Sequence, residues 1–418
     1  PLYSSAASDV YKRQFIRHMK NKSSPSSNHN THLETINSMA KAASPSQTSI
    51  ERAIGDLRRG ALVILRDTST QTAAVIQAAE MATSMGLKII TQIAGSQPTV
   101  AITNHRALAI NIPNQSGRIL SIGLSPNSDA TLIHQIANPT FTGKENDTDF
   151  QPLNPAMLSI IPEESGGIAD RAIQLVKYAR LLPSAVFARI PLAEVDQLSN
   201  LTKNNGLLLV ESASVKSFPK LRAQRLVQAT SAKVPLADAE EAELIAFRPV
   251  DGGDEHLAII IGKIDITNPV LVRLHSQCLT GDLLGSLRCD CGDQLRGAIQ
   301  AIEGFGGGIL IYLAQEGRDI GLINKLRAYN IQDLGVDTVD ANKQLGFEPD
   351  ERLYAPAAEM LKQLRVQSVR LLTNNPDKLQ QLSTAGVKVV ERVAHIFPSN
   401  PHNANYLETK AKKAGHLF

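Results

Sequence analysis

Residues 278–291 read CLTGDLLGSLRCDC and contain all three cysteines of the 418-residue chain. An odd number of cysteines cannot pair off completely in disulfides, and the last two are too close together for an easy bridge. Three thiolates at this spacing favour a zinc site instead. Structural zinc usually has four protein ligands, whereas catalytic zinc keeps three and leaves a position for water or substrate. The ligand count predicts a catalytic zinc site of Cys278, Cys289 and Cys291, although His275 would close the site as a fourth ligand.

The residues on either side predict that this stretch joins a strand to a helix. Residues 270–275 (VLVRLH) are strand-like, as are residues 244–248 and 256–262. After the last cysteine the apolar residues recur at helical spacing, at Leu295, Ala298, Ile299 and Ile302. We therefore expect the metal loop to leave the end of a strand and to enter a helix.

The length and composition of the chain predict a cytoplasmic protein of two domains. A chain of 418 residues exceeds what one core normally holds. Strand-like and helical stretches alternate, which predicts a mixed α/β fold in which each domain is a mixed sheet flanked by helices. No apolar run approaches the roughly 18 residues of a membrane helix. Because the 43 basic and 40 acidic residues are well mixed and tryptophan is absent, we expect no nucleic-acid or membrane partner.

The first 47 residues are expected to lie outside any folded domain. Residues 5–14 (SAASDVYKRQ) resemble a translated sequencing adaptor, so we expect the natural chain to start at Met19. Residues 20–46 are rich in Ser, Asn and Pro, a composition that buries too little apolar surface to offset its chain entropy. Residues 1–47 are therefore predicted to be an adaptor-like artefact followed by a disordered tail.

Residues 48–215 are predicted to form the first domain. Residues 50–65 (IERAIGDLRRGALVIL) resemble the opening of 3,4-dihydroxy-2-butanone 4-phosphate synthase. The resemblance implies a dense acidic loop next, but residues 66–75 (RDTSTQTAAV) keep one carboxylate, Asp67, and hard cations need several oxygen ligands. The family's later Gly-His-Thr-Glu motif corresponds to GGIA at 166–169, without the metal-binding histidine. We expect a degenerate domain with a packing or dimerisation role; the alternative is a bifunctional enzyme that also makes 3,4-dihydroxy-2-butanone 4-phosphate.

A charged, solvated connector, residues 216–226, is expected before a second domain of residues 227–418. In this domain residues 273–282 (RLHSQCLTGD) and 286–292 (SLRCDCG) are similar to the zinc signature of GTP cyclohydrolase II. The likeness continues to the end of the chain through QEGRDIG (315–321), LRAY (326–329), LGFEPDER (345–352) and VRLLTNNPDK (369–378). The resemblance implies zinc-dependent hydrolysis of GTP to 2,5-diamino-6-(5-phosphoribosylamino)pyrimidin-4(3H)-one, formate and pyrophosphate, the first step of riboflavin biosynthesis.

The resemblance also implies a role for individual residues. Arg352 would attack the α-phosphate of GTP, Asp350 would accept a proton, and Tyr329 would act beside the opening guanine ring. Zinc on the three cysteines would activate water, Mg²⁺ would accompany the triphosphate, and the protein would be a homodimer. The residues expected to bind GTP are Arg273, Leu274, His275, Ser276, Gln277, Gln294, Glu316, Gly317, Arg318, Thr338, Thr373 and Lys378.

Two residues depart from the family pattern. Gln277 stands where the family commonly has Glu, which removes a charge beside the metal, and Asp319 stands where a Gly is frequent. Three thiolates weaken the Lewis acidity of Zn²⁺, so we expect Arg288 and Arg273 to supply compensating positive charge. The alternative to an enzyme is a non-catalytic, zinc-stapled nucleotide-binding module, in which His275 completes the metal site.

Overall fold

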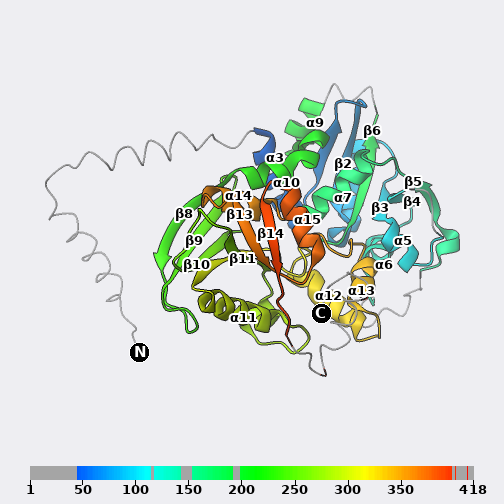
Figure 1. Cartoon of the computed structure of the whole chain (residues 1–418). Coiled ribbons are helices and arrows are strands. Elements are labelled where there is room, and N and C mark those ends of the chain that lie inside the picture. The colour runs from blue at the N-terminus through cyan, green and yellow to red at the C-terminus, as the bar shows by residue number, and fades with distance from the viewer. Residues whose placement is uncertain are drawn as a thin grey trace, which may run out of the picture. The chain divides into compact units, whose positions relative to one another are not determined.

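The computed structural model describes residues 45–113, 117–142, 153–191, 198–397, 401 and 412. The predictions of an adaptor-like artefact, of a start at Met19 and of a disordered tail lie almost entirely outside these residues. The described residues belong to one compact unit with two seven-stranded sheets, each flanked by helices (Figure 1). This confirms the predicted mixed α/β architecture.

The first sheet has the strand order β5-β4-β3-β6-β2-β1-β7. Strands β1 and β7 are parallel and the other neighbours are antiparallel. The strands are β1 (Val63–Asp67), β2 (Thr72–Ala78), β3 (Thr99–Thr103), β4 (Ile119–Gly123), β5 (Ser159–Pro162), β6 (Ser184–Ile190) and β7 (Leu208–Glu211). The α-helices around it are α3 (Pro45–Arg58), α4 (Ser84–Ala94), α5 (Asn104–Ala109), α6 (Ala130–Ala137), α7 (Ile168–Tyr178), α9 (Leu198–Asn205) and α10 (Ser212–Gln224).

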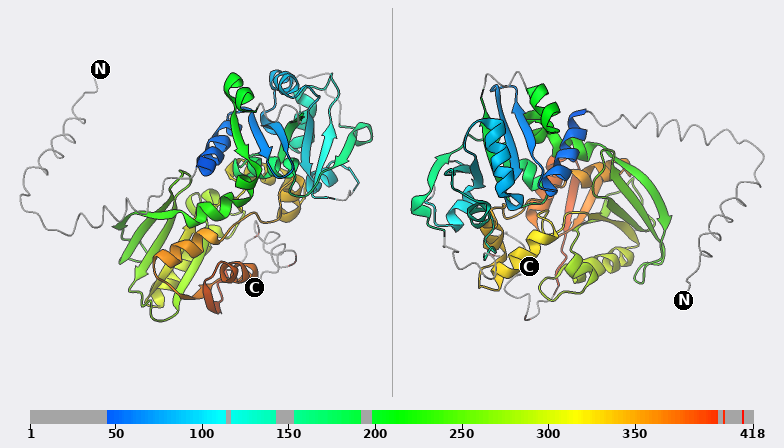
Figure 2. Two further views of the ribbon diagram at one scale, coloured as in Figure 1. Left: turned by 90° about the horizontal axis from the view of Figure 1, so that it is seen from above. Right: turned by 180° about the vertical axis from the view of Figure 1, so that it is seen from behind.

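Helices cover both faces of this sheet because its buried side chains alternate along each strand. Val63 and Leu65 pack with α3, α7 and α10 on one face, whereas Val75 packs with α4 and α6 on the other (Figure 2). The connector at residues 216–226 was expected to be solvated, but most of it lies in helix α10. Val215 and Phe218 of α10 are buried in the core of the first sheet, so this helix is part of the domain.

The second sheet has the strand order β14-β13-β11-β12-β10-β9-β8. Its strands are β8 (Leu226–Lys233), β9 (Ala242–Pro249), β10 (His256–Gly262), β11 (Val270–Ser276), β12 (Gly307–Leu313), β13 (Ser368–Leu372) and β14 (Lys388–Val393). The α-helices are α11 (Cys291–Gly304), α12 (Leu322–Gln332), α13 (Thr338–Gln344), α14 (Ala355–Gln363) and α15 (Pro376–Thr384). Residues of α11 pack on one face of the sheet, and residues of α14 and α15 pack on the other.

Strands β11, β12, β13 and β14 are parallel, and this decides where the site lies. The carboxyl ends of parallel strands meet at one edge of a sheet, which is where ligands bind in open α/β folds. The cysteine loop leaves β11, the QEGR stretch leaves β12, and the NNPDK turn leaves β13. Three sequence motifs therefore meet at one edge.

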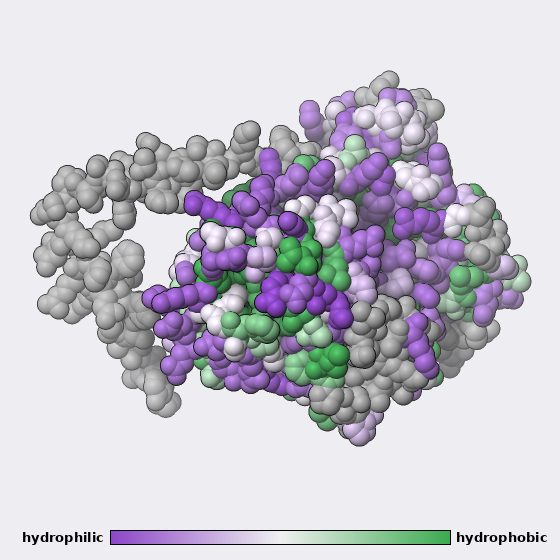
Figure 3. All heavy atoms as spheres, in the orientation of Figure 1, coloured by the Kyte–Doolittle hydropathy of each residue, from purple (hydrophilic) through white to green (hydrophobic). Residues whose placement is uncertain are grey.

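On the face drawn in Figure 3, hydrophilic side chains predominate and hydrophobic ones form small groups. Among the described residues, no helix is both long enough and apolar enough to cross a membrane.

Candidate active site

The three cysteines are brought together by a short turn after β11. Cys278 begins a π-helical turn over Leu279–Leu283, and its Sγ accepts a hydrogen bond from the amide of Gly281 at 3.3 Å. Cys289 and Cys291 return to the same place at the start of α11. The three sulfur atoms all lie within 4.8 Å of one another. In the described part of the chain, this is the only group of three or more His, Cys, Asp or Glu side chains that could hold a metal.

The cysteine geometry fits a zinc ion. Sulfur ligands of tetrahedral zinc with bonds of about 2.3 Å are about 3.8 Å apart, and the Cys278 and Cys289 sulfurs are separated by 3.7 Å. The turn is shaped closely around them, because a Cβ atom on Gly281 would lie 2.9 Å from the Cys289 sulfur and 3.0 Å from that of Cys278. The loop therefore requires a glycine at this position.

Lys325 of α12 provides a buried positive charge beside the thiols. Its Nζ donates to the Cys278 sulfur at 3.0 Å, to Thr280 Oγ1 at 2.9 Å and to Glu316 Oε1 at 2.9 Å. Burial alone would lower the pKa of Lys325, but the contacts with Cys278 and Glu316 raise it overall. Hydrogen bonds from the other two cysteines, and the contact with Lys325, lower the pKa of the Cys278 thiol.

The two arginines that were expected to supply this charge have other partners. Arg273 is buried and donates to the carbonyl of Leu372 at 2.8 Å and to Gln294 Oε1 at 2.7 Å. Arg288 pairs with Asp333 at 2.7 Å. Lys325 was missed because a lysine within a helix carries no local sign that it is buried.

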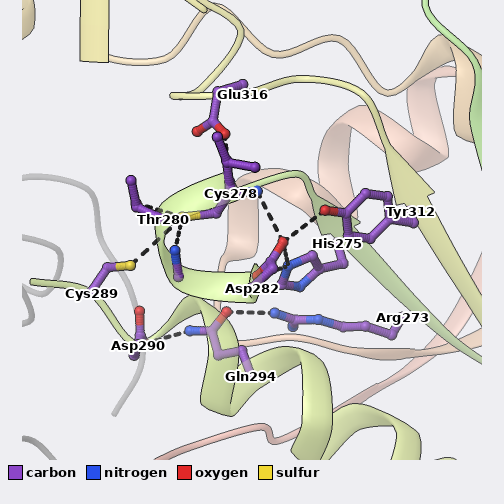
Figure 4. A network of polar contacts seen from close by, with 12 residues as sticks. Arg273, His275, Cys278, Thr280, Asp282, Cys289, Asp290, Gln294, Tyr312 and Glu316 are labelled. Atoms are coloured by element: carbon purple, nitrogen blue, oxygen red, sulfur yellow. Dashed lines mark hydrogen bonds and ion pairs between the residues drawn. The ribbon is translucent and has the colours of Figure 1, made fainter. Parts of the chain in front are cut away.

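His275 points at a carboxylate. Its Nε2 lies 3.1 Å from Asp282 Oδ1, and its ring stacks on Tyr312 with 5.6 Å between ring centroids (Figure 4). Tyr312 also donates to Asp282 Oδ2 at 2.9 Å. Burial lowers the pKa of His275. These contacts hold the imidazole in the wall of the cavity, outside the group of metal-binding side chains.

A cavity opens beside the cysteines. Its lining includes the three cysteines and most of the residues expected to bind GTP: Arg273, His275, Ser276, Gln277, Gln294, Glu316, Gly317, Arg318, Thr338, Thr373 and Lys378. The catalytic candidates Tyr329 and Arg352 also line it. Leu274 does not, because its side chain lies in the core of the second sheet, but its carbonyl accepts a hydrogen bond from Lys378 Nζ at 2.9 Å.

Asp350 and Arg352 form a two-pronged ion pair. Arg352 Nε donates to Asp350 Oδ1 at 2.8 Å, and Arg352 Nη2 donates to Oδ2 of the same carboxylate. The arginine side chain is 13% exposed, so its charge is largely shielded from solvent. Burial would raise the pKa of Asp350, but the charges of Arg352 and Arg318 and the hydrogen bonds of Arg352 lower it overall.

The QEGR stretch links the cysteine turn to the ion pair. Glu316 is buried and accepts from the amide of Leu279 at 2.6 Å, while Arg318 Nη1 donates to the carbonyl of Pro349 at 2.9 Å. Arg318 and Asp319 both have the left-handed backbone that favours glycine, with φ of 64° and 73°. This turn therefore carries strain on two residues with side chains.

Several residues of the cavity were not predicted. Besides Lys325 they include Gln332, Asn342, Asn374, Asn375 and His395. The two consecutive asparagines follow shortly after the apolar run that forms β13, which is a usable signal. His395 had none, because it reaches the cavity from the far end of the chain, where its Nε2 lies 2.9 Å from the carbonyl of Gln294.

Tyr329 lies over the cysteine turn from α12. Its hydroxyl is 3.5 Å from Thr280 Oγ1, and the Arg288 guanidinium lies 4.9 Å from its ring centroid. Burial raises the pKa of Tyr329, so its hydroxyl is protonated at neutral pH. The cavity thus combines three thiols, a phenol and an arginine that is paired with a carboxylate, together with side chains of the types that bind phosphate.

Comparisons with known proteins assign the second sheet to a family. Residues 227–394 match the model of the family described as GTP cyclohydrolase II. The chain is 44% identical over 371 residues to GTP cyclohydrolase-2 of Azospirillum brasilense, covering 88% of this chain and 94% of that protein. It is 55% identical over 175 residues to GTP cyclohydrolase-2 of Klebsiella pneumoniae, covering 42% of this chain and 88% of that protein.

The similarity to other relatives also includes the first domain. The chain is 34% identical over 395 residues to the riboflavin biosynthesis protein RibBA of Chlorobium phaeovibrioides, covering 88% of this chain and 96% of that protein. A solved structure of RibBX, a two-domain 3,4-dihydroxy-2-butanone 4-phosphate synthase from A. baumannii, matches with 15% identity and a TM-score of 0.34, covering 78% of this chain and 93% of that chain.

Proposed function

The chain belongs to the GTP cyclohydrolase II family, whose enzymes act on GTP in riboflavin biosynthesis, and we propose that the cavity beside the three cysteines is its active site. The products would be 2,5-diamino-6-(5-phosphoribosylamino)pyrimidin-4(3H)-one, formate and pyrophosphate. The observation that carries this proposal is the joint position of the cysteine turn and Arg352 on one cavity, although Arg352 lies 61 or more positions after the cysteines in the sequence.

Cys278, Cys289 and Cys291 would hold one zinc ion, in agreement with the spacing of their sulfurs. Zinc would supply Lewis-acid activation of water for opening the imidazole ring of guanine at C8. Lys325 would offset part of the negative charge of three thiolates, because its ammonium touches Cys278. Tyr329 would donate a proton or a hydrogen bond at the opening ring from its place above the cysteine turn.

Arg352 and Asp350 would act at the α-phosphate. A guanidinium is a poor nucleophile while protonated, but the carboxylate of Asp350 is ionised and aligned with its Nε and Nη2 protons. Asp350 would accept a proton as the bond from Arg352 to phosphorus forms and pyrophosphate departs. Hydrolysis of that N–P bond would regenerate Arg352. Arg318 and Lys378 would bind phosphate oxygens, and Mg²⁺ would accompany the triphosphate.

We also propose that the enzyme works in the cytoplasm as a homodimer. Leu283, Leu284 and Leu287, beside the cysteines, are 73%, 70% and 57% exposed, and a second subunit would remove such apolar surface from water. Analytical ultracentrifugation of the full chain tests the dimer. A single species at the monomer mass of 45.1 kDa would contradict it.

The function is tested by measuring formate and pyrophosphate released from GTP by the full, zinc-loaded chain. Arg352→Ala should abolish release of pyrophosphate, and Cys289→Ser should abolish release of formate and lower the zinc content. The matched control is Arg248→Ala, which removes a guanidinium that is 57% exposed and 3.8 Å from Glu255. No formate or pyrophosphate from the wild-type chain with zinc bound would contradict the proposal and favour a nucleotide-binding module.

A further inference from the structure

The first domain contacts two segments of the second domain, the QEGR turn (residues 315–321) and residues 348–352. These segments carry Arg318 and the Asp350–Arg352 pair, and we call them the phosphate-binding end of the site. Leu182, just before β6, is fully buried in a cluster with Ile320, Ala328, Ile331, Ala341, Leu345 and Phe347 of the second domain. These residues lie in α12, in α13 and on either side of them. The cluster places the first domain against the helices that follow the QEGR turn.

Arg180 of the first domain holds the QEGR turn from outside. Its Nη2 donates to the carbonyl of Ala314 at 2.8 Å and pairs with Asp319 at 3.3 Å, while its own carbonyl accepts from Asn324 Nδ2 at 2.9 Å. The approach is close, since a Cβ atom on Gly321 would lie 3.1 Å from the Cβ of Arg180. Arg180 therefore contacts the turn on both sides of Arg318.

The contact with Arg180 accounts for a carboxylate at position 319. Asp319 adopts a left-handed backbone that would suit glycine better, and it lies beside Arg318 in the turn. Its side chain has the guanidinium of Arg180 as its ion-pair partner in the described residues. A residue that strains the turn is thus tied to a side chain of the other domain.

Lys177 of the first domain holds the segment of the ion pair. Its Nζ donates to Glu351 Oε1 at 2.5 Å, and Glu351 lies in sequence between Asp350 and Arg352. The same Glu351 oxygen accepts from the amide of Glu348 at 2.8 Å, and the amide of Glu351 donates to the carbonyl of Arg318 at 3.3 Å. Glu351 therefore joins Lys177 to both segments of the phosphate-binding end, to residues 348–352 through Glu348 and to the QEGR turn through Arg318.

We propose that Lys177 and Arg180 are positioning residues for the cyclohydrolase reaction, through which the first domain sets the geometry of Arg318 and of the Asp350–Arg352 pair. The inference rests on the proposed function of the cavity. Neither residue lines the cavity. Lys177 would act through Glu351, next to Asp350 and Arg352, and Arg180 would act through Asp319, next to Arg318. By this proposal the first domain contributes to catalysis in the second.

The first test is kinetic and uses the full chain. Lys177→Met and Arg180→Ala should each lower kcat for pyrophosphate release by about 10- to 100-fold, as expected for misplaced reacting groups, with zinc content unchanged. The control Arg59→Met removes a side chain that is 71% exposed and pairs with Asp56 of α3, and it should leave kcat unchanged. Arg180→Lys should recover part of the loss. The double variant Arg180→Ala/Asp319→Gly should recover more, because glycine relieves both the strain and the stranded carboxylate.

The second test does not depend on turnover. Hydrogen–deuterium exchange of residues 315–321 and 348–353 should be faster in Lys177→Met and Arg180→Ala than in the wild type, with exchange in the second sheet unchanged. Unchanged exchange in both segments, or kcat within twofold of wild type in both variants, would overturn the inference. If the wild-type chain releases nothing from GTP, the proposed function fails instead, and the exchange experiment still decides whether the first domain orders these segments.

Discussion

Replacing Lys325 with methionine should strongly destabilise the cysteine turn, although this residue carries no signature in the sequence. Its side chain is 10% exposed and that of its partner Glu316 is 7% exposed. Methionine keeps most of the volume but removes three hydrogen bonds, to Cys278, Thr280 and Glu316. The variant therefore leaves a carboxylate buried without its counter-charge.

Breaking a buried ion pair by removing one partner costs about 3–5 kcal/mol. Glu316 keeps two hydrogen bonds from backbone amides, of Leu279 at 2.6 Å and Gly317 at 2.9 Å, which places the expected loss near the lower end, about 3 kcal/mol. The double variant Lys325→Met/Glu316→Gln should recover at least half of this loss, since the buried carboxylate is then replaced by a neutral amide. Zinc affinity of the single variant should also fall by about 10- to 100-fold.

The assay is urea unfolding of the chelator-treated chain, followed by competition of the refolded protein with a chromophoric chelator for zinc. The control Lys362→Met breaks a pair in which the lysine is 78% exposed, and it should change the free energy of unfolding by less than about 0.5 kcal/mol. A loss of under about 1 kcal/mol for Lys325→Met, or no recovery in the double variant, would refute the assignment of Lys325 and Glu316 as a buried pair that supports the cysteines.

Three further results are expected. Burial raises the pKa of Asp319 from 3.8 to about 6, so Asp319→Asn should stabilise the chain by about 1–3 kcal/mol above pH 6. The gain should disappear as the pH falls to 3.8, because protonation of Asp319 then removes the buried charge from the wild type. A pH-independent gain in urea unfolding would contradict this. Gly281→Ala should abolish zinc binding, since its Cβ would lie 2.9 Å from the Cys289 sulfur, whereas the control Gly55→Ala, within α3, should keep zinc; metal analysis separates the two. The full chain with Mg²⁺ and ribulose 5-phosphate should form no 3,4-dihydroxy-2-butanone 4-phosphate, because Asp67 Oδ1 accepts hydrogen bonds from the amide and hydroxyl of Ser69 at 2.9 and 2.5 Å. Detection of that product by chromatography would show that the first domain is active.

Local patterns account for what could be predicted of the fold. Strand-like apolar runs predicted the strands 256–262 and 270–275, and helical spacing predicted the helix after Cys291; the structure has β10, β11 and α11 there. The connector was wrongly expected to be solvated, because the charges of α10 were weighed and its apolar Val215 and Phe218 were not. A helix with one buried face and one charged face carries both signals at once.

The sequence by itself determined the three thiols of the site and the chemistry they favour, because fourteen residues of chain contain all of them. It also placed Arg352 and Asp350 two residues apart, which only motif resemblance connected to the cysteines. Only the tertiary structure decided what surrounds them: Lys325 beside Cys278, His395 beside Gln294, and Arg180 beside Asp319, 139 residues away. The physical reason is that local spacing governs helices and strands, whereas the order of parallel strands decides which distant loops meet at one edge of a sheet.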